Sequence, residues 1–222
     1  MNYLPRIVDE ELDLRLRAVG ATVIVGPKWS GKTTTAKILA EKHNMLYFSS
    51  DDRRFHYYQY AKKDKHPFMT MDASDFWDWS LEKMIAWERG VISEQTPYIL
   101  NDLNELSKNN EKVLFEGMLD FSEVMKVVDP KQMVYLSVNK STVEKEFFER
   151  ADHQGMLDNI LNTPDISDEE KKRRVYMRQT AAIEALYQNV DELTIKTFMR
   201  EDTKSVDDMV RNVEAYLGFC EI

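Results

Sequence analysis

Residues 26–33 have the types and the spacing of a phosphate-binding loop. The segment fits the pattern G-x-x-x-x-G-K-[ST] at every position, in the order Gly26, Pro27, Lys28, Trp29, Ser30, Gly31, Lys32 and Thr33. Glycines allow successive backbone N–H groups to turn toward an anion, and a following helix adds the partial positive charge of its N-terminus. Lys32 would reach the β- and γ-phosphates of a nucleotide, and the Thr33 hydroxyl would ligate Mg²⁺. These residues and Thr34 form the predicted nucleotide site.

ATP with Mg²⁺ is the predicted nucleotide, because the chain lacks an N-K-x-D segment that would bind guanine. Two groups of carboxylates follow strand-like runs. Asp51 and Asp52 come directly after the second run, and Glu116 follows the third. The carboxyl ends of parallel strands face the ligand crevice of an α/β sheet. We therefore expect Asp51 to be the general base, Asp52 to contact substrate, and Glu116 to be a catalytic and magnesium-binding residue.

Alternatives to these carboxylate roles remain open. The choice between Asp51 and Asp52 as the base is not decided by spacing, and two acids after a strand also suit a turn or a helix cap. Glu116 next to a glycine could simply occupy a turn. A functional role is favoured for Glu116, because an unpaired charge at the end of a buried strand is costly.

Basic residues supply candidates for binding the substrate and the transferring phosphoryl group. Arg53 and Arg54 could clamp an anionic or hydroxylated substrate, or balance the neighbouring acids at the surface. The run 171–174 with Arg178 could form a lid, but its acid-to-base pairs at i, i+4 favour a solvated helix. Arg150, beside residues 151–165, is the preferred lid arginine and a predicted catalytic residue.

Short apolar runs of strand length alternate with helical patterns along the chain. The predicted strands are Ala21–Val25, Met45–Ser49, Lys112–Phe115, Met133–Val138 and Leu193–Phe198. The predicted helices include Thr33–His43, Ser74–Gly90, a segment from Ser167 to about Gln188, and a last helix around Val206–Val213. Such alternation predicts a three-layer α/β/α sandwich with a five-stranded parallel sheet and a helical lid.

The length and composition fit one domain. With 222 residues, 43% of them hydrophobic and 31% charged, we expect a single domain over 1–222, with a substrate-side insertion at 51–90 and a lid at 150–180. The net charge of −9 argues against binding of duplex nucleic acid. The uncharged stretch 18–27 is too short to span a bilayer, and Cys220 is the only cysteine. We expect a cytoplasmic protein acting on a small molecule, with a homodimer possible.

The phosphate-loop sequence and three further segments make the chain resemble the P-loop nucleoside and nucleotide kinase-like proteins. The segment 47–54 lies where such kinases carry a base and substrate-binding arginines. Val113–Gly117 is similar to the apolar strand and Glu-Gly step of uridine kinase-like and pantothenate kinase-like enzymes. Residues 134–138 and the helix predicted after them occupy the place of the strand and the lid-entry helix of those kinases. The resemblance implies transfer of the ATP γ-phosphoryl to a hydroxyl or phosphate acceptor.

A second resemblance covers less of the chain. The segments 4–9 and 26–36 look like the N-terminal part of proteins in a group of prokaryotic AAA-type ATPases. Those proteins continue into a second domain, for which we expect no room before Ile222. The third strand also ends in Phe115-Glu116-Gly117 instead of the paired Asp-Glu of an ATP-hydrolysing machine. The kinase hypothesis therefore leads, with an ATPase or a nucleotide-dependent switch as the alternative.

Overall fold

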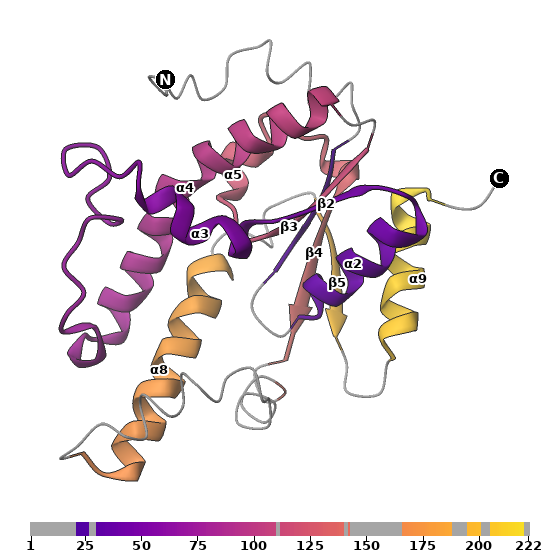
Figure 1. Ribbon diagram of the computed structural model, residues 1–222. Helices are drawn as coiled ribbons and strands as arrows, with labels where there is room; N and C mark the ends of the chain where they lie inside the picture. The colour runs from indigo at the N-terminus through magenta and orange to yellow at the C-terminus, as the bar shows by residue number, and fades with distance from the viewer. Residues whose placement is uncertain are drawn as a thin grey trace.

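A parallel five-stranded sheet organises the molecule (Figure 1). The computed structural model describes residues 21–26, 30–109, 112–139, 142, 166–187, 195–200 and 205–219. The strands lie in the order β2-β3-β1-β4-β5. Their bounds are β1 Thr22–Val25, β2 Leu46–Ser49, β3 Val113–Gly117, β4 Met133–Val138 and β5 Lys196–Arg200. All four pairings are parallel, as the sequence predicts.

The three central strands are buried on both faces, which explains their continuous apolar sequences. The predicted strands agree with the observed ones to within one or two residues, except at the fifth. That strand begins at Lys196 and continues to Arg200, beyond the predicted end at Phe198. It is an edge strand paired only with β4, and its exposed, polar residues carry less apolar signal.

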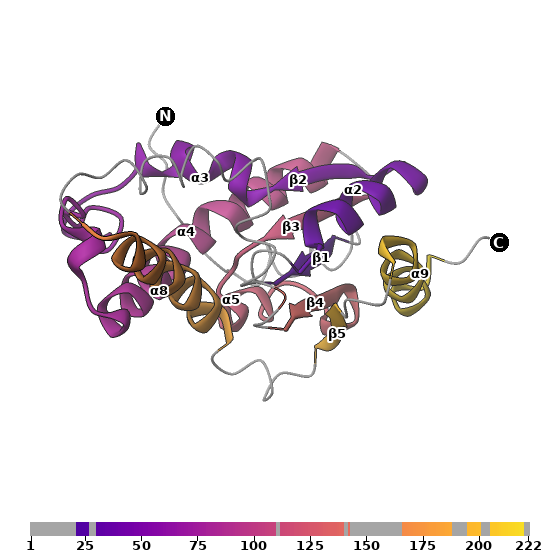
Figure 2. The ribbon, with the colours of Figure 1, turned by 90° about the horizontal axis from the view of Figure 1, so that it is seen from below.

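Helices cover both faces of the sheet, giving the predicted three layers (Figure 2). On one face, α2 Lys32–Lys42 and α9 Val206–Leu217 pack against Ile24, Leu114 and Leu136. On the other, α4 Leu81–Asn109 and α5 Phe121–Val124 pack against Val23, Phe115 and Tyr135. A further helix, α8 Asp168–Tyr187, lies along α4.

One helical prediction was wrong in its bounds, and one helix was not predicted. The predicted helix Ser74–Gly90 begins only at Leu81 and extends to Asn109. The Ser80 hydroxyl accepts a hydrogen bond from the backbone N–H of Lys83, and the residues before it form the 3₁₀ helix η1 Phe76–Asp78. The predicted insertion at 51–90 starts inside helix α3 Ser50–Tyr58, for which no helix was predicted. A second 3₁₀ helix, η2 Pro130–Gln132, precedes β4.

The connection from α3 to α4, residues 59–80, is tied to α4. The Glu94 carboxylate accepts hydrogen bonds from the backbone N–H groups of Phe68 and Met69, at 3.0 and 2.8 Å. The Trp87 indole donates to the Phe68 carbonyl at 3.1 Å. At Gly90, a Cβ atom would lie 2.1 Å from the Phe68 ring, so glycine admits the ring against the helix. This part of the predicted insertion is therefore packed against the domain.

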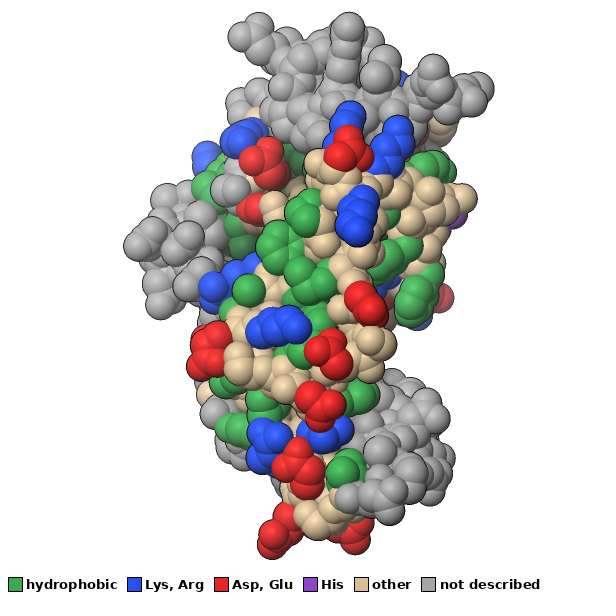
Figure 3. Space-filling model, turned by 90° about the vertical axis from the view of Figure 1, so that its left-hand side faces the viewer, with side chains coloured by type: hydrophobic (Ala, Val, Ile, Leu, Met, Phe, Trp, Pro, Cys, Tyr) green, Lys and Arg blue, Asp and Glu red, His purple; other side chains and the backbone are tan. Residues whose placement is uncertain are grey.

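The face of the molecule shown in Figure 3 carries acidic and basic side chains interspersed with one another. Among the helices of the described residues, none is both long and apolar enough to cross a membrane.

Candidate active site

The predicted phosphate loop, residues 26–33, follows β1, which ends at Val25, and runs into α2, which begins at Lys32. Gly26 leaves the strand with φ 153°, and a Cβ there would lie 2.1 Å from the Leu136 carbonyl oxygen of the neighbouring strand. Only glycine fits this close approach. Helix α2 begins at Lys32, directly after Gly31, so its free N–H groups face the loop. Pro27, Lys28 and Trp29 lie outside the described residues.

Lys32 meets Glu116 at the centre of the site. The Lys32 Nζ atom lies 3.8 Å from Glu116 Oε2, and the two side chains are only 6% and 1% exposed. The strand pairing explains this meeting, because Ile24 in β1 is in register with Glu116 in β3 and the loop follows β1 directly. The structure thus brings together two of the predicted catalytic residues.

Two hydroxyls from the adjacent strand hold the other carboxylate oxygen. Ser49 Oγ donates to Glu116 Oε1 at 2.7 Å, and the Tyr47 hydroxyl donates to the same oxygen at 2.9 Å. Ser49 and Glu116 are partners in the β2–β3 register. Burial and the nearby Glu116 carboxylate raise the pKa of Tyr47, so that it stays a protonated donor at neutral pH. Neither hydroxyl was predicted as a site residue.

The residues present fit a nucleotide phosphate with a divalent cation. Glu116 Oε2 is buried and makes no hydrogen bond within the described part of the chain. Such an oxygen suits Mg²⁺, directly or through water, and Mg²⁺ commonly takes one or two carboxylates plus substrate phosphates. Among the described residues, no group of three or more His, Cys, Asp or Glu side chains could hold a metal alone. Thr33 is partly exposed at the start of α2, and Thr34 is exposed.

The start of α3 is packed onto the end of β3. Gly117 has φ 155°, and a Cβ there would lie 1.9 Å from Ser50 Oγ. Ser50 Oγ also accepts a hydrogen bond from the Met118 N–H at 3.3 Å. Asp51 and Asp52 lie in the first turn of α3 with exposed side chains, and Arg53 is exposed as well. The first residue of α3 therefore contacts the two residues that follow Glu116. The next two residues of the helix, Asp51 and Asp52, are exposed to solvent.

Arg54 lies on the inner face of α3, unlike Arg53. Its guanidinium lies 3.6 Å from the Glu88 carboxylate of α4. Glu88 is fully buried, and its other oxygen lies 2.5 Å from Arg178 of α8. Burial lowers the pKa of Arg178, while the Glu88 charge opposes that effect. The predicted pair Arg53 and Arg54 is therefore separated in the structure. Arg54 shares the Glu88 carboxylate with Arg178, which lies more than a hundred residues further along the chain.

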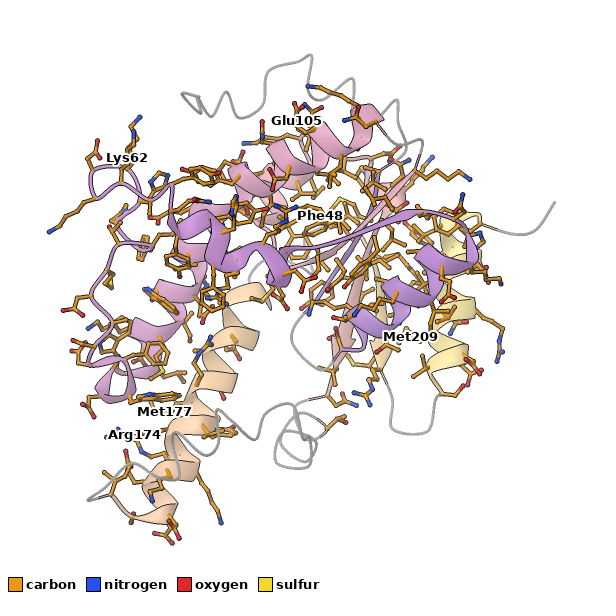
Figure 4. The ribbon with its side chains drawn as sticks, viewed as in Figure 1. Phe48, Lys62, Glu105, Arg174, Met177 and Met209 are labelled. Atoms are coloured by element: carbon orange, nitrogen blue, oxygen red, sulfur yellow. The ribbon has the colours of Figure 1, made fainter. Side chains whose placement is uncertain are left out.

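The basic run at the start of α8 is paired with acidic side chains, and the Glu170–Arg174 pair is one of the i, i+4 pairs that favour a solvated helix. Arg173 and Arg174 both bind Glu170, at 2.7 and 2.9 Å, and Arg174 also binds Asp78 at 2.7 Å. Figure 4 shows Arg174 and Met177 beside the end of the 59–80 segment, away from the sheet. The preferred lid residue, Arg150, and the proposed lid portion 150–165 lie outside the described residues.

Comparison with known proteins supports no family assignment. No protein-family model matches the chain, and no curated protein matches it significantly. Among solved structures, it is similar to a sugar kinase from a Janibacter species, with 13% identity, a TM-score of 0.43, and coverage of 89% of this chain and 94% of the other. It is also similar to a gluconokinase from Sinorhizobium meliloti 1021, with 15% identity, a TM-score of 0.44, and coverage of 91% and 94%. Independently of these, the strand order and the helices on both sides of the parallel sheet give the predicted α/β fold, with the predicted phosphate loop connecting β1 to α2.

Proposed function

We propose that this protein is an ATP-dependent phosphotransferase that transfers the γ-phosphoryl group to a hydroxyl or phosphate of a small molecule. The observation that carries the proposal is the buried pair of Lys32 and Glu116 beside the phosphate loop. A lysine at the start of the loop helix suits phosphates, and a carboxylate with one oxygen lacking a hydrogen bond suits their metal ion.

Catalysis in such a site is positioning and charge neutralisation. The backbone amides of the loop and Lys32 would bind the phosphates. Thr33 and Glu116 would hold Mg²⁺, which neutralises charge on the phosphate oxygens. Asp51 would accept the proton of the acceptor hydroxyl, and Asp52, Arg53 and Arg54 would contact the acceptor. Arg150 would close over the phosphoryl group.

The expectations from composition belong to the same proposal. The protein would act in the cytoplasm on a small molecule, independently of membranes and duplex nucleic acid. The insertion at 51–90 would face the acceptor and the lid at 150–180 would exclude water, because an open site would hydrolyse ATP. Self-association into a homodimer is testable by light scattering.

The proposal is tested by ATP consumption with Mg²⁺, alone and against nucleosides, nucleotides, sugars and sugar acids. Stimulation by one class of acceptor, with the phosphorylated product identified by mass spectrometry, is the expected result. Slow hydrolysis that no acceptor changes would contradict it and favour the ATPase or switch alternative.

Lys32→Ala is expected to abolish transfer and to weaken ATP binding sharply, because the substitution removes the buried charge that faces the phosphates. Titration calorimetry measures the affinity. Lys131→Ala is the matched control, since Lys131 is exposed in η2, before the amino end of β4 and away from the loop. Unchanged ATP affinity in Lys32→Ala would refute the assignment of the phosphate loop.

A further inference from the structure

Arg54 and Arg178 form, around the buried carboxylate of Glu88, a cluster with more positive than negative charge. Two guanidinium groups share one carboxylate, with Arg54 Nη2 3.6 Å from Oε2 and Arg178 Nη2 2.5 Å from Oε1. The three side chains come from α3, α4 and α8. Their formal charges sum to +1, and the arginine side chains are only about one fifth exposed, so the excess positive charge is incompletely solvated. The cluster therefore favours one further anion.

The open side of the cluster is cationic. Glu88 is 0% exposed, whereas the side chains of Arg54 and Arg178 are 19% and 20% exposed. The carboxylate is thus buried, whereas both arginine side chains are partly accessible to solvent. The Phe76 ring lies 5.6 Å from the Arg178 guanidinium carbon and restricts it. By contrast, Arg173 and Arg174 of the same helix are matched by Glu170 and Asp78.

The cluster lies close to the catalytic centre. Ser50 touches the end of β3 next to Glu116, and Arg54 follows it by one helical turn, about 6 Å along the axis. Ser50, Arg54 and Tyr57 have the i, i+4, i+7 spacing of one helical face, and Ser50 and Tyr57 are buried. Arg54 therefore lies on the same helical face as the residue that contacts the end of β3, one turn further along α3.

We propose that Arg54 and Arg178 together bind an anionic group, a carboxylate or a phosphate, on the phosphoryl acceptor. The inference rests on the proposed function and narrows its substrate to hydroxyl compounds that carry such a group. Guanidinium groups suit both anions because their donors match two oxygens at once. Glu88 acts as a positioning residue that holds the two guanidinium groups near each other.

Matched acceptors test the substrate class. Glycerol and glucose form the neutral arm, glycerate and gluconate the carboxylate arm, and glycerol 3-phosphate and glucose 6-phosphate the phosphate arm. ATP-dependent turnover at least tenfold faster with one anionic arm than with its neutral partner is expected and names the anion. Equal turnover of neutral and anionic partners would overturn the anion site and leave the kinase proposal intact.

Binding provides a readout that does not depend on turnover. Glycerate and glycerol 3-phosphate should raise the Tm of the wild-type protein and of Lys32→Ala, in which the phosphate loop is impaired, and should not raise that of Arg178→Gln. This result without any turnover would support the anion site while the proposed function fails. Shifts equal in Arg178→Gln and wild type would overturn the anion site.

Substitutions test whether Arg54 and Arg178 bind the anionic group of the acceptor. Arg54→Gln and Arg178→Gln should each raise the KM for the anionic acceptor at least tenfold, with the KM for ATP unchanged. Arg174→Gln, one turn away on α8, is the matched control and should leave both constants unchanged. Should Arg178→Gln fail to fold, Arg178→Lys retains the charge and tests the planar contact. An unchanged acceptor KM in Arg54→Gln and Arg178→Lys would overturn the proposal.

Discussion

Glu116 has different surroundings at its two carboxylate oxygens. Oε1 accepts hydrogen bonds from Ser49 and Tyr47, whereas Oε2 lies 3.8 Å from Lys32 and accepts no hydrogen bond from the described residues. Two donors on one oxygen fix the rotation of the carboxylate, because turning it would break both bonds. Oε2 is therefore held facing Lys32, at the start of the helix that follows the predicted phosphate loop.

Tyr47→Phe is expected to lower kcat roughly 2- to 10-fold, the value of one hydrogen bond, with little change in the KM for ATP. The ring remains and only the donor to Glu116 is lost. Steady-state kinetics measures both constants, and Tyr216→Phe on α9 is the control. A kcat equal to that of the wild type would show that Ser49 suffices to position Glu116.

Asp51 and Asp52 offer a second test of individual residues. Their exposed positions in the first turn of α3 suit contact with an entering acceptor, and acids there also favour the helix N-terminus. The double variant Asp51→Asn with Asp52→Asn should retain ATP binding by calorimetry and lose turnover. Wild-type turnover in that variant would place the base elsewhere.

At the level of elements, α4 holds together the segments that we propose to bind the acceptor. It carries Glu88, which meets α3 and α8, and Glu94, which meets the 59–80 segment. Trp79 and Trp87 pack with Phe76 between this segment and α8. Trp79 of this segment and Trp87 of α4 therefore belong to one hydrophobic contact that joins the segment to α8.

Gly90→Ala is expected to destabilise the protein by about 1–3 kcal/mol, although alanine favours a helix, because the new methyl group would overlap the Phe68 ring. Denaturant unfolding measures the change. Adding Phe68→Ala removes the overlap, so Gly90→Ala should cost much less in that background. An equal cost in both backgrounds would contradict the proposed contact.

At the level of the whole molecule, an ion-pair cluster links α9 to the C-terminal end of α2 on one face of the sheet. Glu214 lies 2.7 Å from Lys42 Nζ and 2.6 Å from His43 Nε2. The hydrogen bond from Lys42 is the main cause that lowers the pKa of Glu214 from its ordinary value of 4.5, and burial opposes it. A lowered folded-state pKa means that the carboxylate stabilises the fold above pH 4.5, and that this contribution is lost as the pH falls through the folded-state value.

Glu214→Gln should therefore lower the Tm at pH 7, and its difference from the wild type should shrink as the pH falls below 4.5. Thermal unfolding followed by circular dichroism between pH 3 and pH 7 measures both. A Tm difference that is the same at pH 3 and pH 7 would show that the carboxylate charge is not the stabilising feature.

The sequence by itself determined the local features of this protein. Hydrophobic periodicity located the strands, and the spacing of Gly26, Gly31 and Lys32 predicted the phosphate loop between β1 and α2. These features depend on neighbouring residues, so one chain suffices to predict them. Glu116 was also predicted, because strand ends in a parallel sheet share one edge.

Only the tertiary structure decided which distant side chains meet. The register of β2 against β3 places Ser49 and Tyr47 on Glu116, and the packing of α3 and α8 on α4 joins Arg54, Glu88 and Arg178. The sequence left Arg54 indistinguishable from Arg53 and assigned Arg178 to a surface run. Strand register and helix packing depend on the burial of whole faces, and neither is encoded in the spacing of residues within one segment.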